Sequence, residues 1–217
     1  MTRTLVFDVN ETLSDLRPLA VRFEALGAPG ELARLWFAST LREGIALAAA
    51  GDARSFALVG GETAHVLLAP YVDDPAVAAD AVLDSFLELP LHPDVVPGVR
   101  ALAEAGVRLV TLSNGAAAVA ERLLGDAGIR DAFTHVLSVE DAGIWKPAQG
   151  AYAYAASVCG ALPAELTMVA VHPWDLHGAA KAGLRTIWID RERRRWPAHC
   201  TPPGQRVESV GELVRYA

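Results

Sequence analysis

The chain has 217 residues, of which 52% are hydrophobic, and it carries a formal net charge of −7. This composition suits one folded domain with a small insertion, while the acidic pI of about 5.3 argues against a nucleic-acid partner. Two widely separated cysteines exclude a disulfide framework and a structural zinc site, and no apolar run reaches the roughly 18–20 residues that span a membrane. Because the first residues lead directly into a strand pattern instead of a signal peptide, we expect a cytoplasmic protein.

Short runs rich in valine, isoleucine and leucine alternate along the chain with segments of helical spacing. Strands are expected at 5–9, 107–112, 135–138, 168–171 and 186–189. Helices are expected at 99–105, 116–124, 148–159 and 176–182. This alternation predicts an α/β fold with a doubly wound parallel sheet that is covered by helices on both faces. The arginine-rich segment 191–195 is interpreted as a solvated surface loop.

The segment from residue 16 to residue 91 breaks this rhythm. It has apolar residues at helical spacing and no convincing strand, so we expect an all-helical insertion after the first strand. Prolines, which interrupt helices, stand near its two ends at Pro18, Pro90, Pro93 and Pro97. The predicted domains are therefore an α/β core of residues 1–15 and 92–217 and a helical domain of residues 16–91.

Polar residues stand at four places near the predicted strand ends. In chain order these are Asp8, then Ser113 and Asn114, then Lys146, then His172 and Asp175. Because the strand ends of a doubly wound sheet meet at one crevice, we expect these side chains to form one site. A carboxylate can act as a covalent nucleophile, and a hydroxyl, an amide and the backbone donors of a helix N-terminus can bind an anion.

Each of these residues also has an ordinary structural interpretation. Ser113 and Asn114 could cap the helix that follows them, and Asp175 could cap a helix that begins near residue 176. Lys146 could be an exposed loop lysine and His172 an ordinary loop histidine. The joint spacing of the four places favours a site.

In this order, Asp8 with Thr12, Ser113-Asn114, Lys146-Pro147 and Asp175 resemble the motifs of the haloacid dehalogenase superfamily of hydrolases. The resemblance spans essentially the whole chain and implies a Rossmann-like core, with the helical insertion as the cap domain. Further segments are similar to the type II branch, the 2-haloacid dehalogenases: 112–115, 133–139, Tyr152 after Lys146, Trp174-Asp175 and Trp188-Ile189.

The resemblance implies a role for each matching position. Asp8 is the nucleophile, Lys146 balances its charge, and Asp175 orients Lys146 and the hydrolytic water. Ser113 and Asn114 hold the carboxylate of a small acidic substrate, and Tyr152 borders the pocket. The remaining substrate-binding candidates are Val9, Asn10, Thr12, His172, Phe37 and Arg42. Exposed aliphatic residues on the cap helices are compatible with a homodimer.

Asn10 distinguishes the two main reactions of this superfamily. A phosphate ester expels an alkoxide that needs a proton, and the phosphatase members supply it from an aspartate two residues after the nucleophile. An amide stands there in this chain, and general acid catalysis contributes about 10²–10⁴-fold. A halide leaves without a proton, so Asn10 favours carbon–halogen hydrolysis.

The sequence also favours a reaction without a metal cofactor. Magnesium prefers an oxygen shell anchored by carboxylates, and Val171 stands where the phosphatases usually have a further acid. A weakly bound magnesium ion at Asp8 and Asp175 is left open. A magnesium-dependent phosphatase and a catalytically silent binding protein are the two alternatives to a dehalogenase-like hydrolase.

Four positions depart from the type II pattern. Those enzymes bind the halide with a cap arginine that directly follows a tryptophan, whereas Phe37 follows Trp36 here. Arg42 lies on the same predicted helix, roughly 140° around it from Phe37 at about 100° per residue. Ala170 and His172 replace a serine and an asparagine, and Asn10 replaces an aromatic residue. These departures leave the identity of the leaving group and the substrate open.

Overall fold

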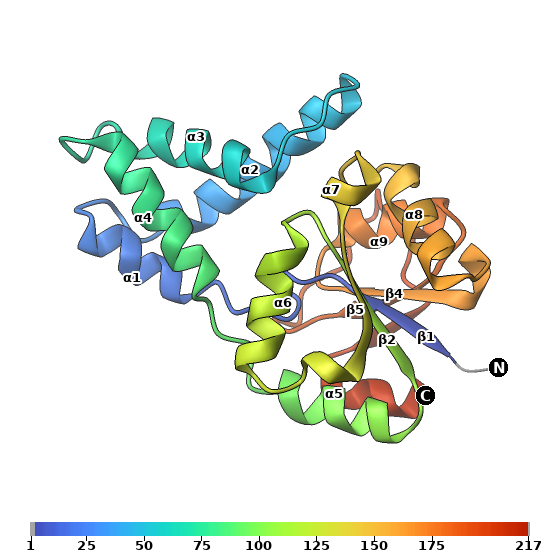
Figure 1. The fold of residues 1–217 in the computed structure, drawn as a ribbon. Helices are drawn as coiled ribbons and strands as arrows, with labels where there is room; N and C mark the ends of the chain where they lie inside the picture. Colours follow the sequence, from blue (N-terminus) through green and yellow to red (C-terminus); the bar gives the residue numbers. More distant parts are fainter. Residues whose placement is uncertain (1–2, 217) are drawn as a thin grey trace. The chain divides into compact units, whose positions relative to one another are not determined.

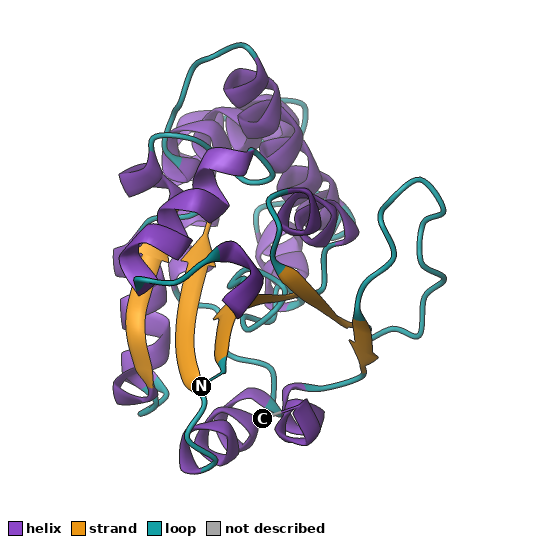
Figure 2. Ribbon diagram, turned by 90° about the vertical axis from the view of Figure 1, so that its right-hand side faces the viewer, coloured by secondary structure: helices purple, strands orange, loops and turns teal. Residues whose placement is uncertain are grey.

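Six parallel strands form one sheet in the order β3-β2-β1-β4-β5-β6. The structure is a computed structural model and describes residues 3–216. The strands are β1 (Thr4–Phe7), β2 (Arg108–Ser113), β3 (Phe133–Ser138), β4 (Leu166–Ala170), β5 (Arg185–Ile189) and β6 (Gln205–Val207). The predicted doubly wound parallel sheet is confirmed, and Figure 2 shows the strands side by side. Sequence patterning missed β6, because three residues at a sheet edge are too few to show a hydrophobic period.

Helices cover both faces of this sheet, as predicted. Figure 1 shows α5 (Val95–Glu104) and α6 (Ala117–Asp126) on one face and α8 (Gln149–Cys159) and α9 (Pro173–Lys181) on the other. The shorter helical elements are α7 (Val139–Ala142), η1 (Arg130–Ala132), η2 (Pro163–Glu165) and η3 (Val210–Tyr216). Among the described residues, no helix is long and apolar enough to cross a lipid bilayer.

The described chain divides into two compact units. One contains the residues up to Ser14 and those from Leu91 onward, and the other is Asp15–Pro90. Each boundary lies one residue before the predicted one. The interpretation of Pro97 as a border residue was wrong, because α5 begins at Val95 and includes it. A proline is tolerated in the first turn of a helix, where its missing N–H has no partner to lose.

The unit Asp15–Pro90 consists of four α-helices, as expected for the insertion. They are α1 (Pro18–Ala25), α2 (Leu32–Ala49), α3 (Phe56–Leu68) and α4 (Pro75–Leu87). Side-chain caps begin two of them: Ser55 accepts the N–H of Leu58 at the start of α3, and Asp74 accepts two N–H groups at the start of α4. An aromatic cluster of Trp36, Phe37, Phe56 and Phe86 fills the interior of this unit.

The position of β1 determines where the site forms in the other unit. All four residues of β1 are buried, and the strand pairs with β2 on one side and β4 on the other. The chain leaves β1 to build the β2–β3 half of the sheet and later crosses back to build the β4–β6 half. The carboxyl end of β1 is therefore the topological switch point, where open α/β sheets bind their ligands.

Candidate active site

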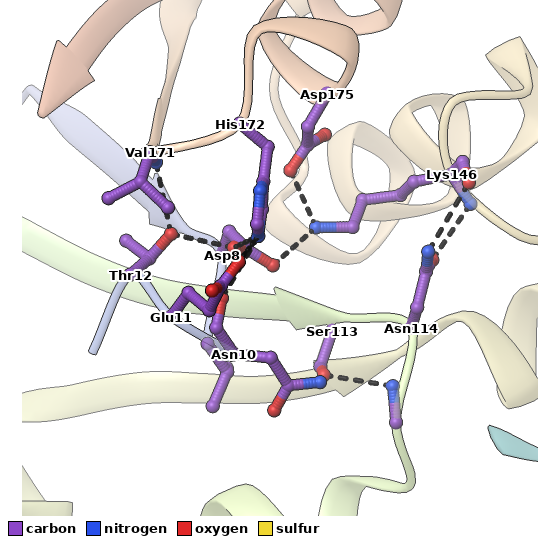
Figure 3. A network of polar contacts seen from close by, with 12 residues as sticks. Asp8, Asn10, Glu11, Thr12, Ser113, Asn114, Lys146, Val171, His172 and Asp175 are labelled. Atoms are coloured by element: carbon purple, nitrogen blue, oxygen red, sulfur yellow. Dashed lines mark hydrogen bonds and ion pairs between the residues drawn. The ribbon is translucent and has the colours of Figure 1, made fainter. Parts of the chain in front are cut away.

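Asp8 is the first residue after β1, and three segments bring polar side chains to it (Figure 3). Ser113 ends β2, Lys146 lies in the loop between α7 and α8, and Asp175 lies in the first turn of α9. These residues are buried, with Lys146 and Asp175 both fully enclosed. The convergence expected from the strand order is thus present within one compact unit.

Lys146 bridges the two carboxylates. Its Nζ donates to Oδ1 of Asp8 at 2.9 Å and to Oδ2 of Asp175 at 2.7 Å. The side chain has no solvent exposure, so the ordinary interpretation as an exposed loop lysine does not apply. A buried ammonium is tolerated only when it is paired and hydrogen-bonded, and here two carboxylates provide both.

The electrostatic balance favours an ionised Asp8. Burial raises the pKa of Asp8, but the positive charge of Lys146, the field of His172 and the hydrogen bond from Thr12 lower it more, so the pKa lies below its ordinary value of 3.8. Burial lowers the pKa of Lys146, and the two carboxylates raise it above its ordinary value of 10.5. Asp8 is therefore a carboxylate and Lys146 an ammonium at neutral pH.

Asp175 faces a different balance. Burial raises its pKa and the charge of Asp8 raises it further, against the lowering effect of Lys146, so the pKa lies above its ordinary value of 3.8. Its second oxygen accepts the hydroxyl of Tyr152 at 2.7 Å. Burial raises the pKa of Tyr152 well above 10, so this phenol remains a donor. Tyr152 was predicted to border the pocket, and in the structure it is fully buried behind Asp175.

The second oxygen of Asp8 has its own donors. Thr12 Oγ1 donates to Oδ2 of Asp8 at 2.6 Å and accepts the N–H of Val171 at 3.1 Å, which links the loop after β1 to the end of β4. His172 Nε2 lies 3.5 Å from the same Oδ2. The two oxygens of Asp8 are thus held by separate groups, Lys146 on one and Thr12 with His172 on the other.

His172 acts as a donor through Nε2. This nitrogen lies 3.2 Å from the carbonyl oxygen of Asn10, and a carbonyl can only accept, so Nε2 carries the proton. The same nitrogen faces the carboxylates of Asp8 and Glu11, at 3.5 and 3.7 Å. Because Nε2 carries the proton of this hydrogen bond, it cannot take a proton from water, and it presents its N–H dipole to the two nearby carboxylates.

Ser113 and Asn114 do not cap the next helix. The residue preceding α6 is Ala116, and no side chain caps that helix. The amide of Asn114 instead forms two hydrogen bonds with the backbone of Lys146. Its Oδ1 accepts the Lys146 N–H at 2.9 Å, and its Nδ2 donates to the Lys146 carbonyl at 3.3 Å. Asn114 therefore holds the loop that delivers Lys146.

Ser113 and Asn10 converge on Gly115. Ser113 Oγ accepts the Gly115 N–H at 2.9 Å, which leaves its own hydroxyl proton to donate elsewhere. A Cβ at Gly115 would lie 3.4 Å from Ser113 Oγ and 3.8 Å from Nδ2 of Asn10. Figure 3 shows the Asn10 amide directed toward Ser113. A hydroxyl and an amide nitrogen thus form a donor-rich side of the site.

Asp175 does not cap α9 either. The residue before this helix is His172, and no side chain caps the helix. Because α9 begins at Pro173 and not near residue 176 as expected, Asp175 lies in its first turn. Gly178, farther along α9, permits the close approach of the loop that follows Lys146. A Cβ there would lie 2.5 Å from Cβ of Pro147 and 2.8 Å from the hydroxyl of Tyr152.

We expect Gly178→Ala to destabilise the protein and disturb the site. The added methyl group would overlap Pro147 and Tyr152, and overpacking of this kind costs about 1–3 kcal/mol of unfolding free energy. Chemical denaturation measures the loss. Gly125→Ala is the matched control, because Gly125 lies in α6 with nothing within 4 Å of its would-be Cβ and alanine there gains about 0.5–1 kcal/mol. Equal changes in unfolding free energy for the two variants would contradict the close packing of Gly178 against Pro147 and Tyr152.

The pair Asp8 and Asp175 does not fit a magnesium ion. The Lys146 ammonium occupies the space between their facing oxygens, and a divalent cation there would meet an adjacent positive charge. Val171 has no carboxylate to offer a metal ion, and its backbone N–H and carbonyl are hydrogen-bonded to Thr12 and Trp188. Across residues 3–216, no group of three or more histidine, cysteine, aspartate or glutamate side chains is arranged to hold a metal ion.

Three predicted binding residues make contacts of other kinds. Val9 is buried, and its carbonyl accepts the N–H groups of Leu13 and Ser14 in the turn after β1. Phe37 packs in the aromatic cluster of the helical unit. The side chain of Arg42 is 69% exposed and pairs with its neighbour Glu43. Their roles toward a substrate stay predictions.

Sequence reasoning missed three residues that shape the site: Glu11, His92 and Arg191. His92 Nε2 donates to the Glu11 carbonyl at 3.0 Å, and Arg191 donates to the Thr12 carbonyl at 2.8 Å. The interpretation of the whole segment 191–195 as solvated was wrong for Arg191, which also pairs with Asp94 and is mostly buried. Its place two residues after β5 was the available signal, because that strand also ends at the site.

The chain matches the family of haloacid dehalogenase-like hydrolases over residues 2–183. It is 28% identical to (S)-2-haloacid dehalogenase 4A of Burkholderia cepacia, over 97% of this chain and 93% of the relative. It is 26% identical to (S)-2-haloacid dehalogenase 1 of Pseudomonas sp. strain CBS-3, over 97% of this chain and 94% of that relative. Among solved structures, L-2-haloacid dehalogenase from Xanthobacter autotrophicus with chloropropionic acid covalently bound is similar with a TM-score of 0.90 and 25% identity, over 99% and 98% of the two chains.

Proposed function

We propose, on the premise that the chain belongs to the family of haloacid dehalogenase-like hydrolases, that it hydrolyses small 2-substituted carboxylic acids through an ester on Asp8. The bridge from Lys146 to Asp8 and Asp175 at the switch point of the sheet carries this proposal. It holds an ionised carboxylate where substrates of this fold bind. The relatives named for 2-haloacid dehalogenation make a 2-haloacid the first substrate to test.

The proposed reaction has two steps. An oxygen of Asp8 forms a bond to carbon 2 of the substrate while the carbon–halogen bond breaks, and the halide leaves with the bonding electrons. Water then adds to Cγ of Asp8, and the bond from Cγ to the ester oxygen that came from Asp8 breaks. This releases a 2-hydroxy acid and a proton and restores the Asp8 carboxylate. The bound chloropropionic acid in the Xanthobacter autotrophicus enzyme supports the first step.

The surrounding residues support a reaction that needs neither a general acid nor a metal ion. Asn10 cannot protonate a leaving group, and a halide requires no proton. Lys146 supplies the positive charge beside both carboxylates. We therefore propose metal-independent hydrolysis, with Asp175 orienting Lys146 and the hydrolytic water. Cytoplasmic location and a homodimer stay predictions.

A substrate panel tests this function. Purified protein is assayed with 2-chloropropionate, fluoroacetate and an aryl phosphate, each with and without a chelator. We expect halide release from a 2-haloacid that the chelator leaves unchanged and that Asp8→Asn abolishes. Phosphate release that depends on magnesium would instead support a phosphatase, and inactivity toward every substrate would support a silent binding protein.

Ser113 is proposed to bind the substrate carboxylate on the donor-rich side. Its oxygen accepts the Gly115 N–H, which leaves the hydroxyl proton to donate to the substrate, and a hydrogen bond to a charged group contributes about 1.5–3 kcal/mol. We expect Ser113→Ala to raise KM for 2-chloropropionate about 10-fold with a smaller change in kcat. Ser157→Ala, on the exposed part of α8, is the control. An unchanged KM would place the substrate carboxylate elsewhere.

A further inference from the structure

Glu11 adopts a backbone conformation that glutamate rarely takes. Its φ is +60°, and in residues 3–216 Arg193, at +54°, is the other non-glycine residue with a positive φ. The left-handed region costs an ordinary side chain about 1–2 kcal/mol, whereas glycine adopts it freely. Such strain at an active site is grounds to look for a functional role of the side chain.

The surroundings hold Glu11 firmly in this conformation. Three consecutive carbonyls of the loop after β1 each accept a hydrogen bond from a distant side chain. His172 donates to Asn10 at 3.2 Å, His92 to Glu11 at 3.0 Å and Arg191 to Thr12 at 2.8 Å. The loop is therefore anchored at every residue from 10 to 12, and the direction of the Glu11 side chain is fixed with it.

The Glu11 carboxylate lies beside the nucleophile. Its Oε2 is 3.7 Å from His172 Nε2, which in turn is 3.5 Å from Oδ2 of Asp8, and Figure 3 shows the two carboxylates grouped around the imidazole. The side chain is 43% exposed, so it can meet a ligand. Burial raises the pKa of Glu11; His172 lowers it and Asp8 raises it, and the net shift is upward.

The site thus carries groups of opposite character. Ser113 and Asn10 offer donors near Gly115, and Glu11 offers acceptor oxygens with negative charge beside His172. Lys146 neutralises only one of the two carboxylates that it contacts. A second anionic group on the substrate would therefore be repelled at Glu11, whereas an N–H or O–H donor would be bound.

We infer that Glu11 is a specificity-determining residue that selects 2-substituted carboxylic acids carrying a hydrogen-bond donor or a positive charge beyond the reacting carbon. This inference rests on the proposed function, because it names the substrate class of the same site. It also explains why a strained glutamate stands where a glycine would satisfy the backbone alone.

The test compares two substrates of nearly the same shape. One is 3-carbamoyl-2-chloropropionate, whose terminal amide has N–H donors, and the other is 2-chlorosuccinate, whose terminal group is a carboxylate. The wild-type protein should prefer the amide by at least about 10-fold in kcat/KM, and Glu11→Gln should reduce that preference to within about 3-fold. Glu192→Gln removes a nearby exposed charge and should change the preference less than about 2-fold.

A binding measurement gives the same comparison without turnover. The dissociation constants of the two product acids, 3-carbamoyl-2-hydroxypropionate and 2-hydroxysuccinate, are measured by calorimetry on the wild type and on Glu11→Gln. Loss of the amide preference in the variant supports the inference. An unchanged preference overturns it, even where 2-chloropropionate is hydrolysed. Absence of halide release from every substrate counts against the proposed function alone.

The melting temperature separates this role from a structural one. Glu11→Gly should keep or raise the melting temperature, by up to about 2–4 °C, while losing the amide preference. Arg193→Gly removes the strain of a positive φ at an exposed position and should leave the preference for the amide substrate unchanged. A clear fall in melting temperature for Glu11→Gly alone would show that the side chain serves folding and would overturn the inference.

Discussion

Lys146→Met is expected to lower the unfolding free energy by about 3–5 kcal/mol and to reduce turnover by about 10²–10³-fold or more. The substitution keeps the length of the side chain but leaves the carboxylates of Asp8 and Asp175 buried without their shared cation. Denaturation by urea measures the stability, and halide release measures turnover. Lys181→Met is the matched control, since Lys181 is the only other lysine of the chain and is exposed.

The pH dependence of this variant has a defined sign. In the wild type the pKa of Lys146 is raised, so its contribution to stability is complete below pH 10.5 and is lost as the pH rises through the folded value. In the variant, burial should raise the pKa of Asp8 and Asp175 above 3.8, and both would bind protons on folding. The stability difference should therefore narrow as the pH falls from 7 toward 4. A stability difference that stays constant with pH would mean that the two buried carboxylates do not cause the loss of stability in the variant.

Asp175→Asn is expected to separate the two steps of the reaction. The Lys146 contact with Asp8 remains, so one equivalent of halide should be released per active site. Loss of the carboxylate that orients Lys146 and the water should slow hydrolysis of the ester by about 10²–10⁴-fold. Mass spectrometry of the intact variant should then show an adduct, which peptide mapping places on Asp8.

An exposed aspartate provides the control for this variant. Asp126→Asn changes a side chain that is 77% exposed and should show full turnover and no adduct. If the Asp175→Asn variant is given a substrate that the wild type turns over and accumulates no adduct, the result would show that Asp175 does not act in the hydrolysis of the ester.

Most of the fold was predictable because its elements carry strong local signals. The buried run of β1 and the alternation that follows it predict a parallel sheet, and apolar residues at helical spacing predict the helical insertion. The boundary at Pro90 was recognised within one residue. The strand β6 was not, because its three residues make only an edge contact with β5.

The centre of the site was predictable from its position at the strand ends, which is why Asp8, Lys146 and Asp175 were singled out. The supporting contacts were not, because they join residues far apart in the chain. Arg191 reaches the Thr12 carbonyl across 179 positions, and no local pattern records such a bond. The conformation of Glu11 is likewise set by the fold, since glutamate does not favour a positive φ.

The central claim is that the product oxygen comes from Asp8, and isotope labelling tests it most directly. A single turnover of 2-chloropropionate is run in H₂¹⁸O with the protein in excess, and both the 2-hydroxy acid and the peptide containing Asp8 are weighed. The ester route predicts an unlabelled product and one ¹⁸O atom in the Asp8 carboxylate, because water attacks Cγ of Asp8. Labelled product with unlabelled Asp8 would show that water attacks the substrate directly and would contradict the account.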